Sequence, residues 1–354
     1  MNSDAANGQP AVASFFSGIG GFDLGFERAG FRIAFQCEID SFCTQILERQ
    51  WPKVPRVANI KEVDYAAVPL ADVWTAGFPC QDISVARMGA RAGLKGKRSG
   101  LFREFARLVG QGRPRVVVIE NVPGLLSSHQ GRDFEFVIRT LAELGYAVGW
   151  RVLNSKDFGV AQSRRRVFVV GCYRDRRGAA EILFEPERST RNAATRGSNG
   201  AKPVSPFKKV AGDPRTGPLV QGIAYCLYAC AGRHTGTDWS RTYVSYPDGR
   251  VRRLAPRECE ALQGFPADWS LPAQLSRDPE KLDTLRYQGV GNAVSVPVAE
   301  WLANRVRRML EQRAFSQTIP SSDGAATWDA GDAGGSEADG RGGSRRHADR
   351  ARSG

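Results

Sequence analysis

The chain has few of the residues that build metal centres and lacks the cysteine spacing of a disulfide framework. Its 354 residues include seven cysteines, an odd number, and no two of them form a CxxC pair. This argues against disulfides and fits a reducing cytosol. The three histidines, His129, His234 and His347, are far apart and form no metal-ligand spacing. We therefore expect no metal site.

Long apolar runs are absent as well. No stretch of about 18 consecutive residues is apolar, so we expect no membrane-spanning segment. Met1–Pro10 lacks a basic start followed by an apolar core, so we expect no signal peptide and a cytoplasmic location. The hydrophobic fraction of 42% is ordinary for a globular protein, and the length suffices for two or three domains.

Positive charge is in excess, with a formal net charge of +13. Residues 314–354 hold five Arg against six Asp and Glu, so the rest of the chain carries +14. This suggests a polyanionic partner such as nucleic acid, and a basic surface that binds nothing is the alternative. The segment 314–354 is rich in Gly, Ala, Asp and Arg without apolar periodicity, so we expect a disordered tail.

A glycine-rich turn near the amino terminus predicts a site for a nucleoside-bearing ligand. Ala11–Phe16 is an apolar strand, Ser17–Phe22 contains three glycines, and a helix follows. This order lets backbone approach such a ligand closely, although the spacing is not the full dinucleotide fingerprint. Glu38 ends a second strand, 20 residues after Gly18. It is either an acid that binds ribose hydroxyls or an acid beside the cap of the next helix.

Cys80 stands where another strand ends. The run Asp72–Ala76 is β-branched and aromatic, and Gly77 and Pro79 then interrupt it. Cys80 is therefore predicted on a turn at the carboxyl end of a parallel strand, where ligands collect in open α/β sheets. It is either a nucleophile or a buried structural cysteine. Residues 81–100 are basic and glycine-rich, which indicates a mobile loop that closes over a charged ligand or a plain surface loop.

Two further segments place charged side chains near this edge. Val116–Ile119 is purely apolar and β-branched, which predicts a central buried strand, and Glu120 follows it directly. A carboxylic acid at that position is a candidate for proton transfer. Before another strand, Arg164 and Arg166 are expected to point to one face and Arg165 to the other.

The second half of the chain predicts a smaller domain. Residues 11–173 carry the alternating strands and helices of a first domain, whereas residues 174–285 are more polar, with short β segments. Residues 286–313 include a helix with an apolar stripe, which we expect to pack back onto the first domain.

Taken in order, these segments resemble the motifs of the DNA (cytosine-5-)-methyltransferases over about residues 12–313. The resembling segments are Phe16–Phe22, Glu38, Gly77–Gln81, Glu120–Val122, Gln162–Arg166, Arg257–Cys259 with Gly264–Pro266, and Gln288–Ala293. The resemblance implies an α/β fold, a Rossmann-like S-adenosylmethionine-dependent methyltransferase sheet with a smaller, mostly β or irregular target-recognition domain. It also implies S-adenosylmethionine as the methyl donor and double-stranded DNA as the substrate.

The same resemblance implies roles for single residues. Cys80 would add to carbon 6 of a cytosine flipped out of the duplex, and Glu120 would hold the proton at ring nitrogen 3. Arg164 and Arg166 would orient the base carbonyl and steady the Cys80 region. The residues implied around the cofactor are Phe16, Gly18, Gly20, Gly21, Glu38, Ile39, Asn59, Ile60, Pro79, Leu101 and Asn292. Those implied at the DNA are Gln81, Ser84, Arg98, Gln162 and Arg233. The implied context is a monomeric bacterial enzyme of a restriction–modification system with a cognate restriction endonuclease.

Three positions depart from the family's pattern. Ser14 and Asn59 stand where the family commonly has Asp, and Cys226-Leu227 stands where a Thr-Leu pair is typical. An Asn carbonyl can still accept a hydrogen bond from an adenine amino group. The alternatives are an RNA methyltransferase of the same fold, a non-catalytic DNA-binding relative and a nicotinamide-dependent oxidoreductase. The Cys-Phe-Thr signature of the RNA branch is absent, the nucleophile and the acid are both present, and the glycine spacing weighs against the oxidoreductase.

Overall fold

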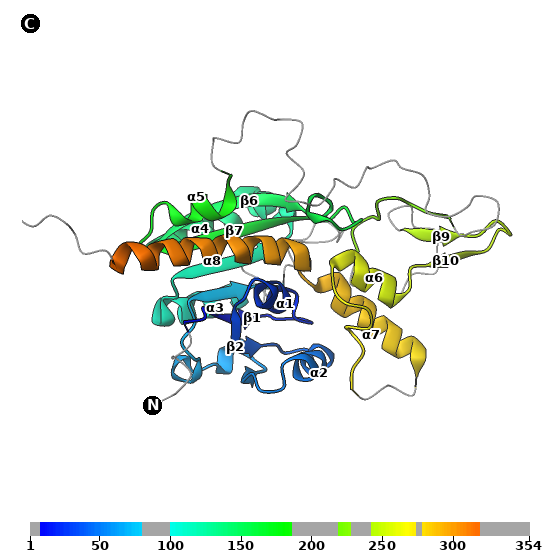
Figure 1. Ribbon diagram of the computed structural model, residues 1–354, viewed down its shortest axis with the longest axis horizontal. Helices are drawn as coiled ribbons and strands as arrows, with labels where there is room; N and C mark the ends of the chain where they lie inside the picture. The colour runs from blue at the N-terminus through cyan, green and yellow to red at the C-terminus, as the bar shows by residue number, and fades with distance from the viewer. Residues whose placement is uncertain (1–7, 80–99, 186–218, 228–241, 274–277, 319–354) are drawn as a thin grey trace, which may run out of the picture.

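The computed structural model describes residues 8–79, 100–185, 219–227, 242–273 and 278–318. Within these ranges, helices cover both faces of a seven-stranded sheet, and a three-stranded sheet lies apart from it (Figure 1). The helices are α1 (Gly21–Arg28), α2 (Ser41–Gln50), α3 (Gly100–Gly112), α4 (Arg132–Glu143), α5 (Gly178–Leu183), α6 (Pro256–Gln263), α7 (Pro279–Asn292) and α8 (Val296–Thr318). The strands are β1 (Ala11–Phe15), β2 (Arg32–Cys37), β3 (Arg56–Val57), β4 (Val73–Ala76), β5 (Val116–Asn121), β6 (Tyr146–Asn154), β7 (Arg165–Tyr173), β8 (Leu219–Val220), β9 (Tyr243–Ser245) and β10 (Val251–Arg253). None of the described helices combines the length and the apolar character needed to cross a membrane.

The large sheet has the strand order β3-β2-β1-β4-β5-β7-β6. The strands from β3 to β5 are parallel, whereas β7 is antiparallel to both of its neighbours. From β1 the chain moves outward to β2 on one side and then to β4 on the other. The direction of winding therefore reverses between β1 and β4, and open α/β sheets bind ligands outside the strand ends at such a point.

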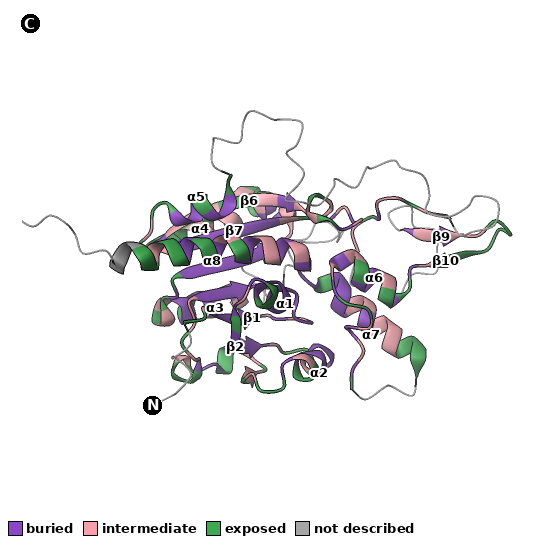
Figure 2. Cartoon of the chain, in the orientation of Figure 1, coloured by how far each residue is buried: buried purple, intermediate pink, exposed green. Residues whose placement is uncertain are grey.

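Alternate residues of the central strand β5 enter two separate apolar layers. Val116 and Val118 lie in the core beneath α1, α5 and α8, whereas Val117 and Ile119 lie in the core beneath α3 and α4. All four side chains are fully buried. A strand covered on both faces requires an unbroken apolar run, which is the pattern that the sequence shows. Figure 2 shows the buried strands between helices that are exposed on their outer sides.

Helix α8 packs across α1 although the two are far apart in sequence (Figure 1). A Cβ added to Gly25 would lie 2.5 Å from the Cβ of Ala299, so the helices approach each other through their smallest side chains. Val298, Leu302 and Val306 form the buried stripe of α8. Apolar burial of this kind contributes roughly 1.5–3 kcal/mol per large side chain, which secures the contact.

Two helices differ from what the sequence indicated. The segment after residue 173 was expected to be irregular, yet α5 forms there because Ala179, Ile182 and Leu183 are buried against the main sheet and α8. We therefore propose that the smaller domain begins after α5 rather than at residue 174. The second helix is α7, whose last turn contains the Gly291-Asn292 pair, where the sequence indicated no helix.

The smaller sheet has the antiparallel order β10-β9-β8 and lies beside α6 and α7 (Figure 1). Glu260 of α6 and Arg286 of α7 form a buried ion pair, with 2.9 Å between Oε1 and Nη2. The hydroxyl and backbone N–H of Ser270 donate to the same carboxylate oxygen. Removing one member of such a pair would leave an uncompensated buried charge, so the pair fixes α6 against α7.

Candidate active site

The turns that follow β1, β2, β4 and β5 meet at the carboxyl edge of the sheet. Gly77, just after β4, marks the meeting point. A Cβ added to it would lie 3.9 Å from Glu120 Oε2, 3.9 Å from the carbonyl oxygen of Phe16 and 4.0 Å from Val294 Cγ2. Segments that are distant in sequence therefore surround one position, as expected of parallel strands.

The turn after β1 depends on left-handed backbone conformations. Phe16, Gly18 and Gly20 have φ values of 56°, 57° and 88°. A Cβ added to Gly20 would lie 2.5 Å from the ring of Trp51, so only glycine fits. A Cβ on Gly18 would meet no described atom within 4 Å, and the backbone there is open to a ligand. Gly21 begins α1, and a Cβ added to it would lie only 2.4 Å from the carbonyl oxygen of Val294.

The Glu38 carboxylate spans the ends of β1 and β2. The backbone N–H groups of Gly18 and Asp40 donate to Oε2 and Oε1, with N–O distances of 2.7 and 2.8 Å. Burial raises the pKa of Glu38, and the two backbone donors oppose that rise. Asp40 is the N-cap of α2, so the contact beside a helix cap, one of the two sequence interpretations, is present. Each carboxylate oxygen retains a lone pair for a ribose hydroxyl, so the second interpretation stays compatible.

Ile39 follows with 72% of its surface exposed, an apolar side chain in the open beside that carboxylate. A nucleoside fits this set of groups: a carboxylate that can accept hydrogen bonds from hydroxyls, an open glycine backbone and an exposed aliphatic side chain. This donor set agrees with the implied S-adenosylmethionine.

Asn59 caps a short turn, Ile60–Glu62, near this edge. Its Oδ1 accepts from the N–H of Lys61 at 3.2 Å, and its Nδ2 donates to Glu62 Oε1 at 2.9 Å. Glu62 thus brings a carboxylate next to Asn59, the position where the family commonly has Asp. The other residues implied at the cofactor are Ile60, which is buried, Leu101, which is half-buried in α3, and Pro79 and Asn292, which are exposed.

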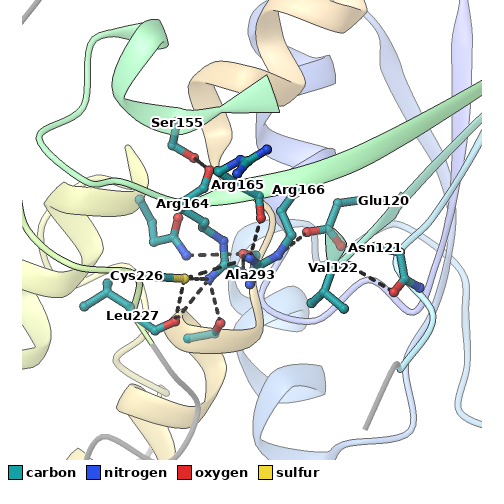
Figure 3. A network of polar contacts seen from close by, with 12 residues as sticks. Glu120, Asn121, Val122, Ser155, Arg164, Arg165, Arg166, Cys226, Leu227 and Ala293 are labelled. Carbon is teal, nitrogen blue, oxygen red and sulfur yellow. Dashed lines mark hydrogen bonds and ion pairs between the residues drawn. The ribbon is translucent and has the colours of Figure 1, made fainter. Parts of the chain in front are cut away.

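Glu120, at the end of β5, is buried and paired with Arg166 of β7 (Figure 3). Its Oε1 lies 3.0 Å from Arg166 Nε, and the side chains are 10% and 16% exposed. Oε1 has no hydrogen-bond partner among the described residues, so the contact is an ion pair without hydrogen-bond alignment. A buried acceptor without a donor costs about 1–3 kcal/mol, and a ligand N–H would remove that cost.

Asn121 ties this strand end to the turn that leads to Cys80. Its Nδ2 donates to the carbonyl of Phe78 at 3.4 Å, and its Oδ1 accepts from the N–H of Val122 at 2.9 Å. Phe78 is buried and packs on Phe102 with 5.4 Å between ring centroids. Asn121 was not predicted from the sequence as a site residue, although its place directly after Glu120 was a usable signal.

Arg164 is buried, with 1% of its surface exposed. Its Nη1 donates to the carbonyls of Gly291 at 3.1 Å and Leu227 at 3.2 Å, and its Nη2 to that of Ala293 at 2.9 Å. It therefore holds the carbonyls on both sides of Asn292. Burial lowers the pKa of Arg164 to about 10, and the nearby positive charge acts in the same direction. The resemblance implied that Arg164 orients the base carbonyl and steadies the Cys80 region. In the fold its guanidinium instead donates to backbone carbonyls of the segments around Leu227 and Asn292.

Gln162 is also fully buried. Its Nε2 donates to the carbonyl of Leu262 at 3.0 Å, and its Oε1 accepts from the N–H of Leu227 at 3.0 Å. Both ends of the amide are thus bonded within the protein instead of facing DNA as expected from the sequence. The segment that contains Leu227 is held to the segment before β7 through this side chain.

Cys226, which stands at the usual Thr position, lies beside both arginines (Figure 3). Its Sγ is 3.7 Å from Arg164 Nη1 and 3.9 Å from Arg166 Nη1. Arg165, between them in sequence, is exposed, in agreement with the predicted alternation. The remaining candidates, Cys80, Gln81, Ser84, Arg98 and Arg233, lie outside the described residues.

Comparison with known proteins places this site in a family. The model of the C-5 cytosine-specific DNA methylase family matches residues 11–197 and 188–308. The chain is 30% identical to the type II methyltransferase M2.BsuMI of Bacillus subtilis, over 91% of this chain and 82% of the relative. It is 32% identical to the type II methyltransferase M.NgoBI of Neisseria gonorrhoeae, over 80% of this chain and 89% of the relative.

Solved structures give the same result for the fold. The Entamoeba histolytica methyltransferase EhMeth superposes with a TM-score of 0.61 at 18% identity, covering 85% of this chain and 99% of its own. A Spodoptera frugiperda DNMT2 variant superposes with a TM-score of 0.62 at 16% identity, covering 84% and 100%. The predicted Rossmann-like methyltransferase sheet is confirmed. The motif order along the sequence predicted the family correctly, and the chain belongs to the C-5 cytosine-specific DNA methylases.

Proposed function

We propose that this chain transfers a methyl group from S-adenosylmethionine to carbon 5 of a cytosine flipped out of a specific duplex DNA site. We further propose that it protects DNA as the modification enzyme of a bacterial restriction–modification system, because its relatives at about 30% identity are type II methyltransferases. In this proposal it acts as a cytoplasmic monomer whose cognate endonuclease is a functional partner.

The observation that carries the proposal is the unsatisfied Oε1 of Glu120. This atom is buried, lies 3.0 Å from Arg166 Nε and lacks a hydrogen-bond donor among the described residues. A cytosine protonated at ring nitrogen 3 offers the missing N–H. Gly77 lies beside the same carboxyl group, three residues before Cys80. The acid thus stands next to the turn that carries the proposed nucleophile.

The chemistry follows from the poor reactivity of cytosine carbon 5. Addition of the Cys80 thiolate to carbon 6 moves electron density to carbon 5, and Glu120 holds the proton at nitrogen 3 so that charge does not build up on the ring. When bound, S-adenosylmethionine supplies the electrophilic methyl group. Loss of the proton from carbon 5 and expulsion of the Cys80 thiolate then restore the aromatic ring. Arg166 keeps the carboxyl group in place throughout.

The cofactor is proposed to lie along the edge formed by Phe16–Gly21, Glu38 and Ile39. Glu38 would accept hydrogen bonds from ribose hydroxyls, Ile39 would pack on the adenine, and Asn59 would accept from its amino group. Pro79, Leu101 and Asn292 would complete the pocket, and Ile60 would support it from the core. No metal takes part in this proposal.

Access to the base requires that it leave the duplex, because neither face of a stacked cytosine is open to attack. The proposed DNA contacts are Gln81, Ser84, Arg98 and Arg233. The net charge of +13 favours binding to the phosphate backbone, which should weaken steeply with salt.

The decisive experiment uses duplex DNA that carries 5-fluorocytosine in the target site. Fluorine at carbon 5 prevents the final elimination, so the protein should stay covalently attached, and the adduct should survive denaturing electrophoresis. Cys80→Ser should form no adduct and transfer no methyl groups while still binding DNA. Bisulfite sequencing of DNA from cells that express the chain identifies the site. Adduct formation by the Cys80→Ser protein would refute the nucleophile.

A further inference from the structure

A buried carboxylate lies beneath the proposed cofactor turn. Asp23, on α1, has no solvent exposure. Its Oδ2 accepts a hydrogen bond from Ser14 Oγ at 3.0 Å, and its Oδ1 accepts one from Gln36 Nε2 at 2.7 Å. Burying a carboxylate is costly even when it is hydrogen-bonded, so the place of Asp23 depends on the groups that hold it.

The polar contacts continue from Gln36 to a cation. Gln36 Oε1 accepts from Arg56 Nε at 2.7 Å, and Arg56 Nη2 donates to the carbonyl of Leu47 at 2.9 Å. The carboxylate and the guanidinium are thus joined through one side-chain amide. The network connects α1, β1, β2, β3 and the end of α2, which are the elements around the proposed nucleoside pocket.

The place of this network along the strands relates it to the cofactor. Ser14 and Gln36 are partners in the register of β1 and β2. Two residues further along the two strands stand Phe16 and Glu38, both assigned to the cofactor. The hydroxyl of Ser17 also donates to the carbonyl of Ser14 at 3.1 Å. Both strand ends are therefore fixed immediately before they deliver these residues.

We propose that Asp23 is a positioning residue for S-adenosylmethionine: its carboxylate, held by Ser14 and Gln36, sets the turn after β1 against Glu38 before the cofactor binds. The inference rests on the proposed cofactor role of that turn. A pocket ordered in advance loses less entropy when the ligand binds, so affinity depends on the network even though Asp23 lies beneath the pocket.

The contact between Ser14 and Asp23 allows the proposal to be tested by exchanging the two residues. The family commonly has Asp at this position, and here the Ser14 hydroxyl meets a carboxylate that comes from α1 instead. Because Ser14 Oγ and Asp23 Oδ2 are 3.0 Å apart, the hydroxyl and the carboxylate can be exchanged between strand and helix in a double variant. Ser14→Asp combined with Asp23→Ser keeps one hydroxyl and one carboxylate in contact. Ser14→Asp alone opposes two carboxylates, and Asp23→Ser alone leaves the amide of Gln36 without its acceptor.

The test measures S-adenosylmethionine affinity by calorimetry, without DNA, for the wild type, both single variants and the double variant. Each single variant should raise Kd by about tenfold or more, and the double variant should return to within about threefold of the wild type. Urea unfolding of each protein reports stability in parallel. Asp133→Ser is the matched control, because Asp133 is a buried acid that also accepts from a serine, Ser128, but lies on α4. It should lower stability and leave Kd unchanged.

The outcomes separate this inference from the proposed function. A wild type that binds S-adenosylmethionine, with single variants of equal affinity, would overturn the role of Asp23 and leave the proposed function intact. If the double variant binds S-adenosylmethionine no more tightly than the single variants, through misfolding or otherwise, then a hydroxyl and a carboxylate in exchanged places do not restore the pocket, and that part of the proposal is wrong. If Kd rises equally for Asp133→Ser and Asp23→Ser, the loss of affinity reflects lower overall stability and not a positioning role of Asp23. A wild type that does not bind the cofactor would refute the proposed pocket itself.

Discussion

Glu120 and Arg166 form an ion pair with 3.0 Å between Oε1 and Nε, and the pair joins the adjacent antiparallel strands β5 and β7. The guanidinium stabilises the carboxyl group by charge and leaves its Oε1 without a hydrogen bond among the described residues. An acid that is charge-stabilised yet short of a donor is prepared to accept an N–H from a substrate.

Replacing Arg166 should therefore impair the chemical step. Arg166→Ala is expected to lower kcat by about 10²-fold or more, because Glu120 loses its partner, and to leave the KM for S-adenosylmethionine nearly unchanged. Transfer of a radiolabelled methyl group to DNA measures both constants. Arg165→Ala is the matched control, since Arg165 is the exposed neighbour, and it should keep kcat. Equal losses in the two variants would contradict the role of Arg166.

Replacing Arg164 should act on stability instead. Arg164→Met fills similar space but leaves the carbonyls of Leu227, Gly291 and Ala293 without their donor. We expect the free energy of unfolding to fall by about 2–4 kcal/mol, measured by urea denaturation. The KM for S-adenosylmethionine should rise as well, because the segment around Asn292 loosens. Unchanged stability would show that the carbonyls find other partners.

Replacing Cys226 should affect turnover more than stability. Its Sγ lies 3.7 Å from Arg164 Nη1 and 3.9 Å from Arg166 Nη1, and Cys226→Val removes that weak acceptor while nearly conserving volume. We expect kcat to fall by about tenfold, with the free energy of unfolding changed by less than about 1 kcal/mol. Cys226→Ser keeps a polar atom and should retain most of the activity. Similar kcat values for Cys226→Val and Cys226→Ser would show that the contacts of the sulfur atom with the arginines do not affect turnover.

Asp23 should make stability depend on pH in a defined direction. Burial raises its pKa from 3.8 to about 6, against the lowering effects of its hydrogen bonds and of Arg56. The folded state therefore binds the proton more tightly, so this group lowers stability as pH rises from about 4 to about 6 and adds no further change above that range. Compared with Asp23→Asn, the wild type should gain on the order of 3 kcal/mol between pH 7 and pH 4. Urea unfolding of both proteins over this range provides the measurement, and parallel pH curves would contradict it.

Much of the sheet could be predicted because its strands are buried on both faces. Val116–Ile119 is apolar without interruption, and the glycines and Pro79 mark the turns at the carboxyl edge, so local patterns carried the information. The 20-residue spacing from Gly18 also marked Glu38 as a candidate site acid, whereas its hydrogen bond from the Gly18 N–H was not predicted. The family was identified from the order of such segments rather than from any one of them.

Other features depend on contacts between distant segments, which local patterns do not show. Helix α7 was missed because glycines at 289 and 291 disfavour helix, whereas in the fold a Cβ added to Gly289 would lie 2.9 Å from Ile19 Cγ2. Arg164 was grouped with Arg166 because alternate residues share a face. Only the fold reveals that carbonyls from two other segments surround Arg164, and that Gln162 is bonded at both ends of its amide.

The contact between Gly25 of α1 and Ala299 of α8 bears on how the enzyme is made. A ribosome-bound chain has no partner for the outer side of α1 until almost all of the described polypeptide has emerged. Contacts so distant in sequence form slowly and late. The glycine turn that α1 anchors at its amino end therefore gains this packing only after the residues of α8 have been synthesised.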